Sequence, residues 1–209
     1  AQIRINEICA SNYKSFRVNE ESPDWVELEN TSSEPVNLGG FYISDNANDM
    51  LMYTLPDTLI SAGEHYVVFC AGDQTDGFTS ATFKLGSDGE TIYLSSPQGA
   101  LLEYVEFPHL PTDHSYGLQN GTWRFFEIPS PNAPNLGPSF SAFAIPPVLS
   151  LDPGSYQGSQ TVTVTTVEGQ SIVLGYNGNT PTIPYTGPLT IDSTSVIEFR
   201  SVMDEGLPS

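Results

Sequence analysis

WVELEN, at residues 25–30, is the stretch that decides the fold of the first half of the chain. Trp25 and Glu27 alternate with Val26 and Leu28, and a period of two residues is typical of a half-buried β-strand. An amphipathic helix would instead repeat its apolar residues every three or four positions. The stretch therefore predicts a strand with one face toward a core and the other toward solvent.

Further apolar segments lie on both sides of this strand, separated by stretches rich in turn-forming residues. In IRINEIC (3–9), Ile3, Ile5 and Glu7 share one parity and Ile8 has the other. We find no apolar period typical of a long helix, and strands at nearly even spacing predict an all-β sandwich or barrel. The other strands predicted in this half are VNLGGFYIS (36–44), MLMYTL (50–55), HYVVFCA (65–71), ETIYLSS (90–96) and ALLEYVEF (100–107).

A proline-rich stretch at residues 129–147 interrupts this pattern. Its six prolines remove backbone donors and stiffen the chain, which predicts a semi-rigid linker. We therefore expect two domains, residues 1–135 and 148–209, joined by a linker at 136–147. The strands predicted in the second domain are VLSL (148–151), QTVTVTT (160–166), SIVLGY (171–176) and VIEFRSV (196–202), with a turn at NGN (177–179).

The charge balance is strongly acidic, with 6 Lys and Arg against 25 Asp and Glu and a net charge of −19. Nucleic acids and anionic membrane surfaces are bound through basic patches, so this balance argues against both as partners. No stretch of about 18 apolar residues exists to enter a membrane. The acidity is explained by ordinary solubility or by divalent cations. The start at Ala1-Gln2, ahead of a strand, is what a mature chain would show after removal of a signal peptide, and also what a trimmed one would show.

Calcium is the one cofactor that the sequence suggests. The loop SDNANDM (44–50) gathers Asp45, Asn46, Asn48 and Asp49, and calcium prefers such oxygen ligands. The alternative is that these side chains cap the turns of their own loop. Further loop carboxylates are Asp24, Glu27, Asp73, Asp76 and Asp88.

The two cysteines, Cys9 and Cys70, each lie in a strand-like apolar run. They would form one disulfide if their strands were neighbours, and would otherwise be two buried thiols. Both alternatives are open at this point.

No group of residues has the spacing of an active site. Asp113, His114 and Ser115 are consecutive, and neighbouring strand residues point to opposite faces, so they cannot converge on one atom. Glu103 and Glu106 are three positions apart and would also face opposite ways, so we expect both on the solvated surface. The three histidines lack the spacing of a zinc site. We therefore assign no catalytic residue, no cofactor-binding residue and no metal ligand.

Aromatic side chains are the candidates for stacking on sugars, since sugars bind to flat exposed rings. The alternative is packing within the strands, where aromatic residues are common. The candidates are Tyr156, Tyr176 and Tyr185 in the second domain and Trp25, Tyr42 and Trp123 in the first.

Residues 3–135 resemble the lamin tail domain in its bacterial, extracellular form, which implies an immunoglobulin-like β-sandwich. The resemblance rests on INEICASN (5–12), PDWVELEN (23–30), PVNLGGFYISD (35–45), ISAGEHYVVFCAG (60–72), FKLGSDGETIYLSSPQG (83–99), PTDHSYGL (111–118) and PSPNAPN (129–135). Residues 146–209 resemble the chitobiase/β-hexosaminidase C-terminal type of module, which implies a second, smaller sandwich. Its motifs are PPVLSLDPGSYQGSQTVTV (146–164), YNGNTPT (176–182), YTGPLTI (185–191) and VIEFRSVMDEGLPS (196–209). The pair Asn177-Gly178 stands where that family usually has Asp-Gly, and Asn serves the same turn.

The order of the two modules is similar to the N-terminal region of secreted bacterial proteins that continue into a CotH-type, kinase-like domain. This implies a non-catalytic structural or interaction module pair, extracellular, surface-bound or periplasmic, which presents a domain absent from these residues. We expect a monomer whose partner is a protein or glycan at the cell surface. The alternatives are a carbohydrate-binding accessory region of an extracellular enzyme and a calcium-stabilised spacer.

Overall fold

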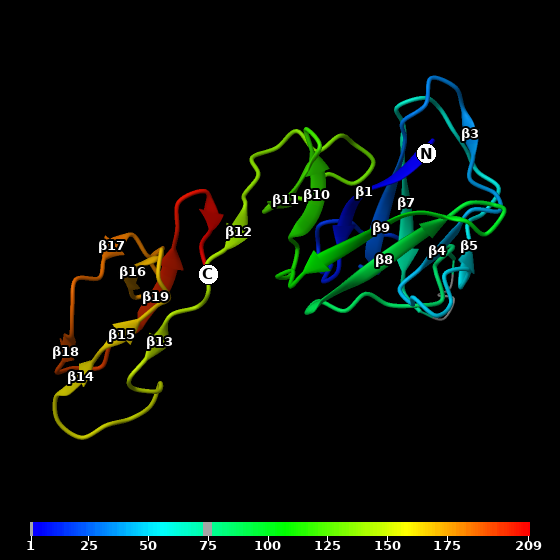
Figure 1. Cartoon of the computed structure of the whole chain (residues 1–209). Coiled ribbons are helices and arrows are strands. Elements are labelled where there is room, and N and C mark those ends of the chain that lie inside the picture. The colour runs from blue at the N-terminus through cyan, green and yellow to red at the C-terminus, as the bar shows by residue number, and fades with distance from the viewer. Residues whose placement is uncertain (1, 73–76) are drawn as a thin grey trace. The chain divides into compact units, whose positions relative to one another are not determined.

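The computed structural model describes residues 2–72 and 77–209, and the chain divides into two compact units, Ala1–Ser139 and Phe140–Ser209 (Figure 1). Every regular element of the described residues is a β-strand, so the predicted all-β class is confirmed. Within these residues we find no helix that is long and apolar enough to span a membrane.

The first unit contains a five-stranded antiparallel sheet in the order β11-β10-β1-β2-β7. In this sheet, β1 at the start of the chain pairs with β10 from near the end of the unit (Figure 1). The five strands can therefore assemble only when both ends of the unit are present. Its strands are β1 (Ile3–Cys9), β2 (Asp24–Asn30), β7 (His65–Cys70), β10 (Ser115–Gln119) and β11 (Thr122–Phe126).

A second antiparallel sheet in the order β5-β4-β8-β9 completes the sandwich, and β3 and β6 form a short ribbon. The predicted segment 36–44 holds two short strands instead of one, because the chain turns at Gly39 and Gly40, where Gly40 has a φ of 84°. These strands are β3 (Val36–Asn37), β4 (Tyr42–Ser44), β5 (Tyr53–Thr54), β6 (Leu59–Ile60), β8 (Gly89–Ser95) and β9 (Leu101–Pro108). The core side chains of the two sheets include Ile3, Ile5, Ile8, Val26, Leu28, Val68, Ile43, Ile92, Leu94, Val105 and Phe107.

A β-bulge in β1 changes the parity that the sequence suggested. The register of β1 against β2 shifts between Ile5 and Glu7, so Ile5 lies opposite Leu28 and Ile8 lies opposite Val26. The extra residue carries Ile3, Ile5 and Ile8 onto one face, although their spacing in a regular strand would split them. It also moves Glu7 to the opposite face of the sheet, which we call the outer face.

The outer face is covered around Trp25 and Glu27, and here the prediction of a half-buried WVELEN strand is wrong. Trp25 and Glu27 on the outer face of β2 are as completely buried as Val26 and Leu28 on its core face. At one end, Cys9, Trp25 and Val67 form a small apolar cluster with Phe16 and Phe69 packed against it. The alternating pattern predicts a solvent-exposed face, but loop residues, among them Ser130 and Asn132, cover this part of the sheet.

The two cysteines are free and buried, which decides between the two alternatives of the sequence. Strand β2 separates β1 from β7, so the cysteine-bearing strands are not neighbours. Cys9 lies opposite Trp25, and Trp25 lies opposite Phe69, so Cys70, one residue further along β7, points to the other face of the sheet. Burial raises the pKa of the Cys9 thiol to about 12, and it raises that of Cys70 as well.

The hairpin between β10 and β11 turns at Asn120-Gly121, a pair with a clear turn signal in the sequence. Asn120 and Gly121 both adopt positive φ, 51° and 78°, as a two-residue hairpin turn requires. An Asn-Gly pair between alternating segments is a strong predictor of such a turn. The strands predicted for the first domain end at residue 107, whereas the chain returns to the sheet in β10 and β11.

The second unit is a smaller assembly of short strands around Val162, Val164 and Ile172, with Leu151, Tyr185, Ile191 and Phe199 packed against them. The predicted strand 160–166 splits at Thr163, because β14 pairs with β18 and β15 pairs with β13 in another sheet. Asn177 and Gly178 adopt positive φ, which confirms the predicted turn. The strands are β12 (Ala142–Phe143), β13 (Val148–Leu149), β14 (Gln160–Val162), β15 (Val164–Thr165), β16 (Ser171–Tyr176), β17 (Ile183–Pro184), β18 (Leu189–Ile191), β19 (Ile197–Val202) and β20 (Gly206–Leu207).

Residues 136–147, which the sequence assigned to a linker, are divided between the units. Ser139 donates a hydrogen bond to Gln119 and belongs to the first unit. Further along, β12 pairs in parallel with β20 near the end of the second unit. The boundary between the compact units therefore falls between Ser139 and Phe140.

Candidate functional site

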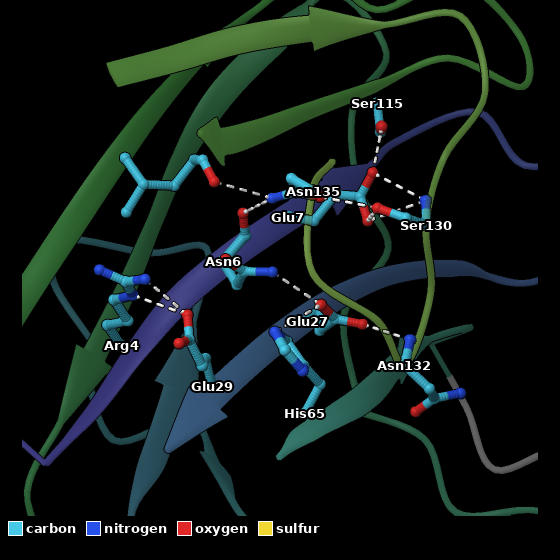
Figure 2. Close-up of polar contacts among 11 residues, drawn as sticks. Arg4, Asn6, Glu7, Glu27, Glu29, His65, Ser115, Ser130, Asn132 and Asn135 are labelled. Atoms are coloured by element: carbon cyan, nitrogen blue, oxygen red, sulfur yellow. Dashed lines mark hydrogen bonds and ion pairs between the residues drawn. The ribbon is translucent and has the colours of Figure 1, made fainter. Parts of the chain in front are cut away.

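The most unusual chemistry of the first unit lies on the outer face of its five-stranded sheet (Figure 2). Glu7 on β1 and Glu27 on β2 are cross-strand partners, and both have no exposed surface. Side chains in such positions lie side by side, about 5 Å apart at Cβ. Two acidic groups thus share one buried site, with the apolar cluster around Trp25 on one side of them.

Residues 129–135, which we call the closing segment, cover this pair and provide most of its hydrogen bonds (Figure 2). The Ser130 N–H donates to both carboxyl oxygens of Glu7, each at 3.1 Å, and the Asn132 N–H donates to Glu27 Oε2 at 2.5 Å. Asn132 has a φ of 61°, a conformation that Asn tolerates better than most residues. The backbone of the closing segment is therefore shaped to present N–H groups to the two carboxyls.

The sheet itself supplies the remaining donors. Ser115 Oγ on β10 donates to Glu7 Oε1 at 2.5 Å, and Asn6 Nδ2 donates to Glu27 Oε1 at 2.8 Å. Asn6 reaches Glu27 because the bulge in β1 turns it toward the outer face. All four carboxyl oxygens are engaged.

Asn135 holds the closing segment to the sheet. Its Nδ2 donates to the carbonyl oxygens of Asn6 at 3.0 Å and Leu118 at 3.1 Å, and its Oδ1 accepts from Ser130 Oγ at 2.8 Å. Gly117 leaves room for it, since a Cβ at that position would lie 2.8 Å from Asn135 Nδ2. This one side chain therefore bridges β1, β10 and the segment.

Burial raises the pKa of both carboxyls. Desolvation brings the pKa of Glu7 to about 7, against the lowering effect of its hydrogen bonds from Ser115 and Ser130. Desolvation brings the pKa of Glu27 to about 8, also against its hydrogen bonds from Asn6 and Asn132. Perturbed carboxyl groups in a cluster are a common mark of functional sites, although structural networks produce them too.

Beside the pair lies an open cavity of about 180 Å³. Arg4 and Glu29 form an ion pair at 2.6 Å on its wall, and His65 is part of the same lining. Burial lowers the pKa of His65, so its ring is neutral at pH 7. Its Nε2 lies 3.9 Å from Glu27 Oε1, which is beyond hydrogen-bond distance.

The structure places the consecutive residues Asp113, His114 and Ser115 in separate roles. Asp113 Oδ1 accepts the backbone N–H groups of Tyr13, Lys14 and Ser15. His114 Nδ1 lies 2.9 Å from the Thr112 carbonyl oxygen, and the buried Ser115 contacts Glu7. The three side chains do not converge.

The prediction of a solvated Glu103 is wrong, whereas Glu106 is exposed. Glu103 is half-buried and accepts the backbone N–H of Ile5, next to the bulge in β1. Burial raises its pKa. Glu103 thus provides an acceptor for a β1 donor.

The polar groups of the predicted calcium loop, residues 44–50, form hydrogen bonds within the loop. Ser44 Oγ donates to the Asp49 carbonyl oxygen at 2.6 Å, and Asn46 Oδ1 accepts the Asn48 N–H at 2.9 Å. In the described part of the chain no group of three or more His, Cys, Asp or Glu side chains is placed to hold a metal ion. Asp73 and Asp76 lie outside the described residues. Calcium binding at Asp45, Asn48 and Asp49 stays a prediction.

The aromatic candidates for sugar stacking fall into two groups. Trp25 is fully buried, and Tyr185 packs edge-on against Phe199 in the core of the second unit. Tyr156 and Tyr176 are 46% and 36% exposed. In the first unit, Tyr42 is half-buried, and Trp123 is half-buried and stacks on Tyr116 with ring centroids 5.2 Å apart.

Sequence reasoning missed the paired role of Glu7 and Glu27. The sequence places Glu27 in the predicted strand 25–30 and also among the loop carboxylates, and the structure confirms the strand position, in the middle of β2. Each of the two strands carries a glutamate among apolar residues, which is the one local signal that the sequence offers. Nothing in the local pattern gives the bulge that turns Glu7 toward Glu27.

Comparisons with known proteins agree with this architecture. The family model of the Lamin Tail Domain matches residues 1–109, and that of the Chitobiase/beta-hexosaminidase C-terminal domain matches residues 151–209. Searches of curated proteins and of solved structures gave no match. The first match ends before β10, β11 and the closing segment, which complete the sheet of the first unit. The resemblance to both families and the immunoglobulin-like class of both modules are thus confirmed, and the chain belongs to the Lamin Tail Domain family, with a Chitobiase/beta-hexosaminidase C-terminal domain after it.

Proposed function

We propose that this chain is a non-catalytic pair of structural and interaction modules of a secreted or surface-exposed bacterial protein. In this role it presents a downstream domain, of the CotH type by the order of the modules, outside the cytoplasm. Its partner is a protein or glycan at the cell surface. Both modules belong to immunoglobulin-like families, and the strongly acidic surface supports a highly soluble part that does not bind nucleic acid.

The observation that carries this proposal is the state of Glu7 and Glu27. A buried carboxyl pair with raised pKa values is the arrangement in this chain that most resembles a catalytic acid and base. Here the two groups occupy adjacent strand positions with no exposed surface, and the chain itself engages all four oxygens. A glycosidase needs the bond it cleaves to lie between its carboxyls. These carboxyls support a structural role instead.

An activity screen of the whole chain tests the proposal. We expect no turnover of chromogenic glycosides, phosphate esters or carboxylic esters above that of heat-denatured protein. Turnover that copurifies with the folded chain and falls in a Glu27→Gln variant would contradict a non-catalytic role. Light scattering in the same preparation is expected to give a monomer.

A carbohydrate-associated role is the second candidate, and the exposed Tyr156 and Tyr176 favour it. We expect the double variant Tyr156→Ala with Tyr176→Ala to lose any retention on insoluble glycan that the parent chain has. The matched control is Tyr13→Ala, since Tyr13 is a highly exposed tyrosine of the first unit. Equal retention of parent and double variant would remove the support for this candidate.

A further inference from the structure

The Glu7 and Glu27 carboxyls receive their hydrogen bonds from neutral groups. The donors are the backbone N–H groups of Ser130 and Asn132, the Ser115 hydroxyl and the Asn6 side-chain amide. The Ser130 hydroxyl lies 3.3 Å from Glu7 Oε2. Among the described residues the one basic side chain within 4 Å of either carboxyl is His65, whose low pKa leaves it neutral at pH 7. Arg4 is paired with Glu29 instead. Two negative charges at this site would therefore be buried without a cation, which is unfavourable.

The hydrogen-bond network has a place for a proton on Glu7. Ser130 Oγ carries one proton and lies 2.8 Å from Asn135 Oδ1 and 3.3 Å from Glu7 Oε2. Asn135 Oδ1 is an acceptor, because Nδ2 of the same side chain faces two carbonyl oxygens. When Ser130 donates to Asn135, its lone pair faces Glu7 Oε2. A protonated Glu7 can donate to that lone pair, whereas an ionised one cannot.

The other ionisable groups around the site do not supply the missing positive charge. Arg124 on β11 contacts Ser139, and Asp113 is held by the backbone of residues 13–15. The closing segment has no ionisable side chain. The remaining ionisable groups on the surrounding elements include Cys9 on β1, Asp24 on β2, Tyr66 and Cys70 on β7, Glu103 on β9, His114 before β10 and Tyr116 on β10, and none of them supplies a positive charge to the pair.

We propose that Glu7 and Glu27 form a proton-dependent latch for the closing segment, which stays on the sheet while the pair retains a proton and opens more easily once both carboxyls are ionised. Opening lets water reach the two charges and separates the Ser130 and Asn132 N–H groups from them. The segment lies four residues before the boundary between the compact units, which follows Ser139. Release of residues 129–135 would thus add length and freedom to the connection between the units.

The direction of the pH dependence follows from linkage. Both pKa values are raised in the closed state, to about 7 and about 8, above the ordinary value of 4.5 that a solvated carboxyl would have after opening. The closed state therefore binds protons more tightly than the open state. Its advantage is complete below pH 4.5, declines as the pH rises to about 8, and is constant above that.

Amide hydrogen exchange of the whole chain, followed residue by residue by NMR, tests the latch. After correction for the intrinsic rate, we expect the opening constant at Ser130 and Asn132 to rise at least about tenfold between pH 5 and pH 8. Above pH 8 it should level off. An opening constant that is independent of pH at both amides would overturn the proposal.

Two variants separate the latch from general effects of charge. Glu27→Gln removes one of the two ionisations, so the opening constant should rise less steeply with pH than in the parent chain. Glu29→Gln is the matched control, because Glu29 lies two residues away on the outer face of the same strand and is paired with Arg4. An equal loss of slope in both variants would contradict the proposal.

A direct titration covers the case in which Glu27→Gln does not fold. The side-chain carboxyl carbon signals of Glu7 and Glu27 in the parent chain should change with midpoints well above pH 5. Midpoints near 4.5 for both groups would show that the closed site holds no proton at neutral pH, and the latch would be refuted.

Discussion

Replacing Asn135 with alanine should destabilise the first unit by about 3 kcal/mol. The change removes three side-chain hydrogen bonds, to Asn6, Leu118 and Ser130, and a buried hydrogen bond contributes about 1 kcal/mol. Asn135 is itself buried, so water does not readily replace its partners. A unit of this size unfolds with an entropy of about 0.3 kcal/mol/K, so the midpoint of thermal unfolding should fall by about 10 °C.

Tryptophan fluorescence is the appropriate assay, because both tryptophans of the chain, Trp25 and Trp123, lie in the first unit. The signal then reports that unit alone while the second one unfolds without a tryptophan signal. Asn48→Ala is the control, since Asn48 is exposed and its backbone N–H makes the hydrogen bond to Asn46. It should cost less than about 0.5 kcal/mol. If Asn135→Ala melts within about 2 °C of the parent chain, the role assigned to Asn135 is refuted.

Three further outcomes follow from the same structure. A fragment ending at residue 109 should lack native circular dichroism while one ending at 139 folds, because β10, β11 and the closing segment complete the sheet around Glu7; a folded shorter fragment would contradict this. Gly117→Ala should lower the midpoint of the fluorescence melt, since its Cβ would meet Asn135 and Phe126, whereas Gly121→Ala, with open space around it but a strained φ, should cost about 1 kcal/mol. Cys9 and Cys70 should react with maleimide after unfolding and not before, because burial raises both thiol pKa values; labelling of native protein, read by mass spectrometry, would argue against their burial.

Strand positions were the part of the fold that the sequence predicted well. WVELEN, HYVVFCA and SIVLGY fall on β2, β7 and β16, because alternation and β-branched content are local properties. Strand pairing was harder, as QTVTVTT shows by changing sheets at Thr163. The first half pairs with β18 and the second half with β13, and the local sequence pattern does not indicate either partner.

The candidate site could not be predicted because each of its determinants is remote or irregular. Glu27 alternates as a surface residue would, and its burial depends on a segment more than a hundred residues later. Glu7 faces Glu27 only because one extra residue at Asn6 shifts the register. The Asn120-Gly121 pair, by contrast, predicts the turn between β10 and β11, and β10 carries Ser115, which donates to Glu7.

The closing segment also sets the order in which this protein can mature as it is synthesised. Glu7 leaves the ribosome 108 residues ahead of Ser115 and 123 residues ahead of Ser130. Until those residues emerge, the nascent sheet keeps its outer face open, with β1 lacking a strand on one side. An unpaired strand edge of this kind is prone to aggregation. The sheet of the first unit can therefore be completed only after residue 135 has emerged, when the two ends of the unit come together.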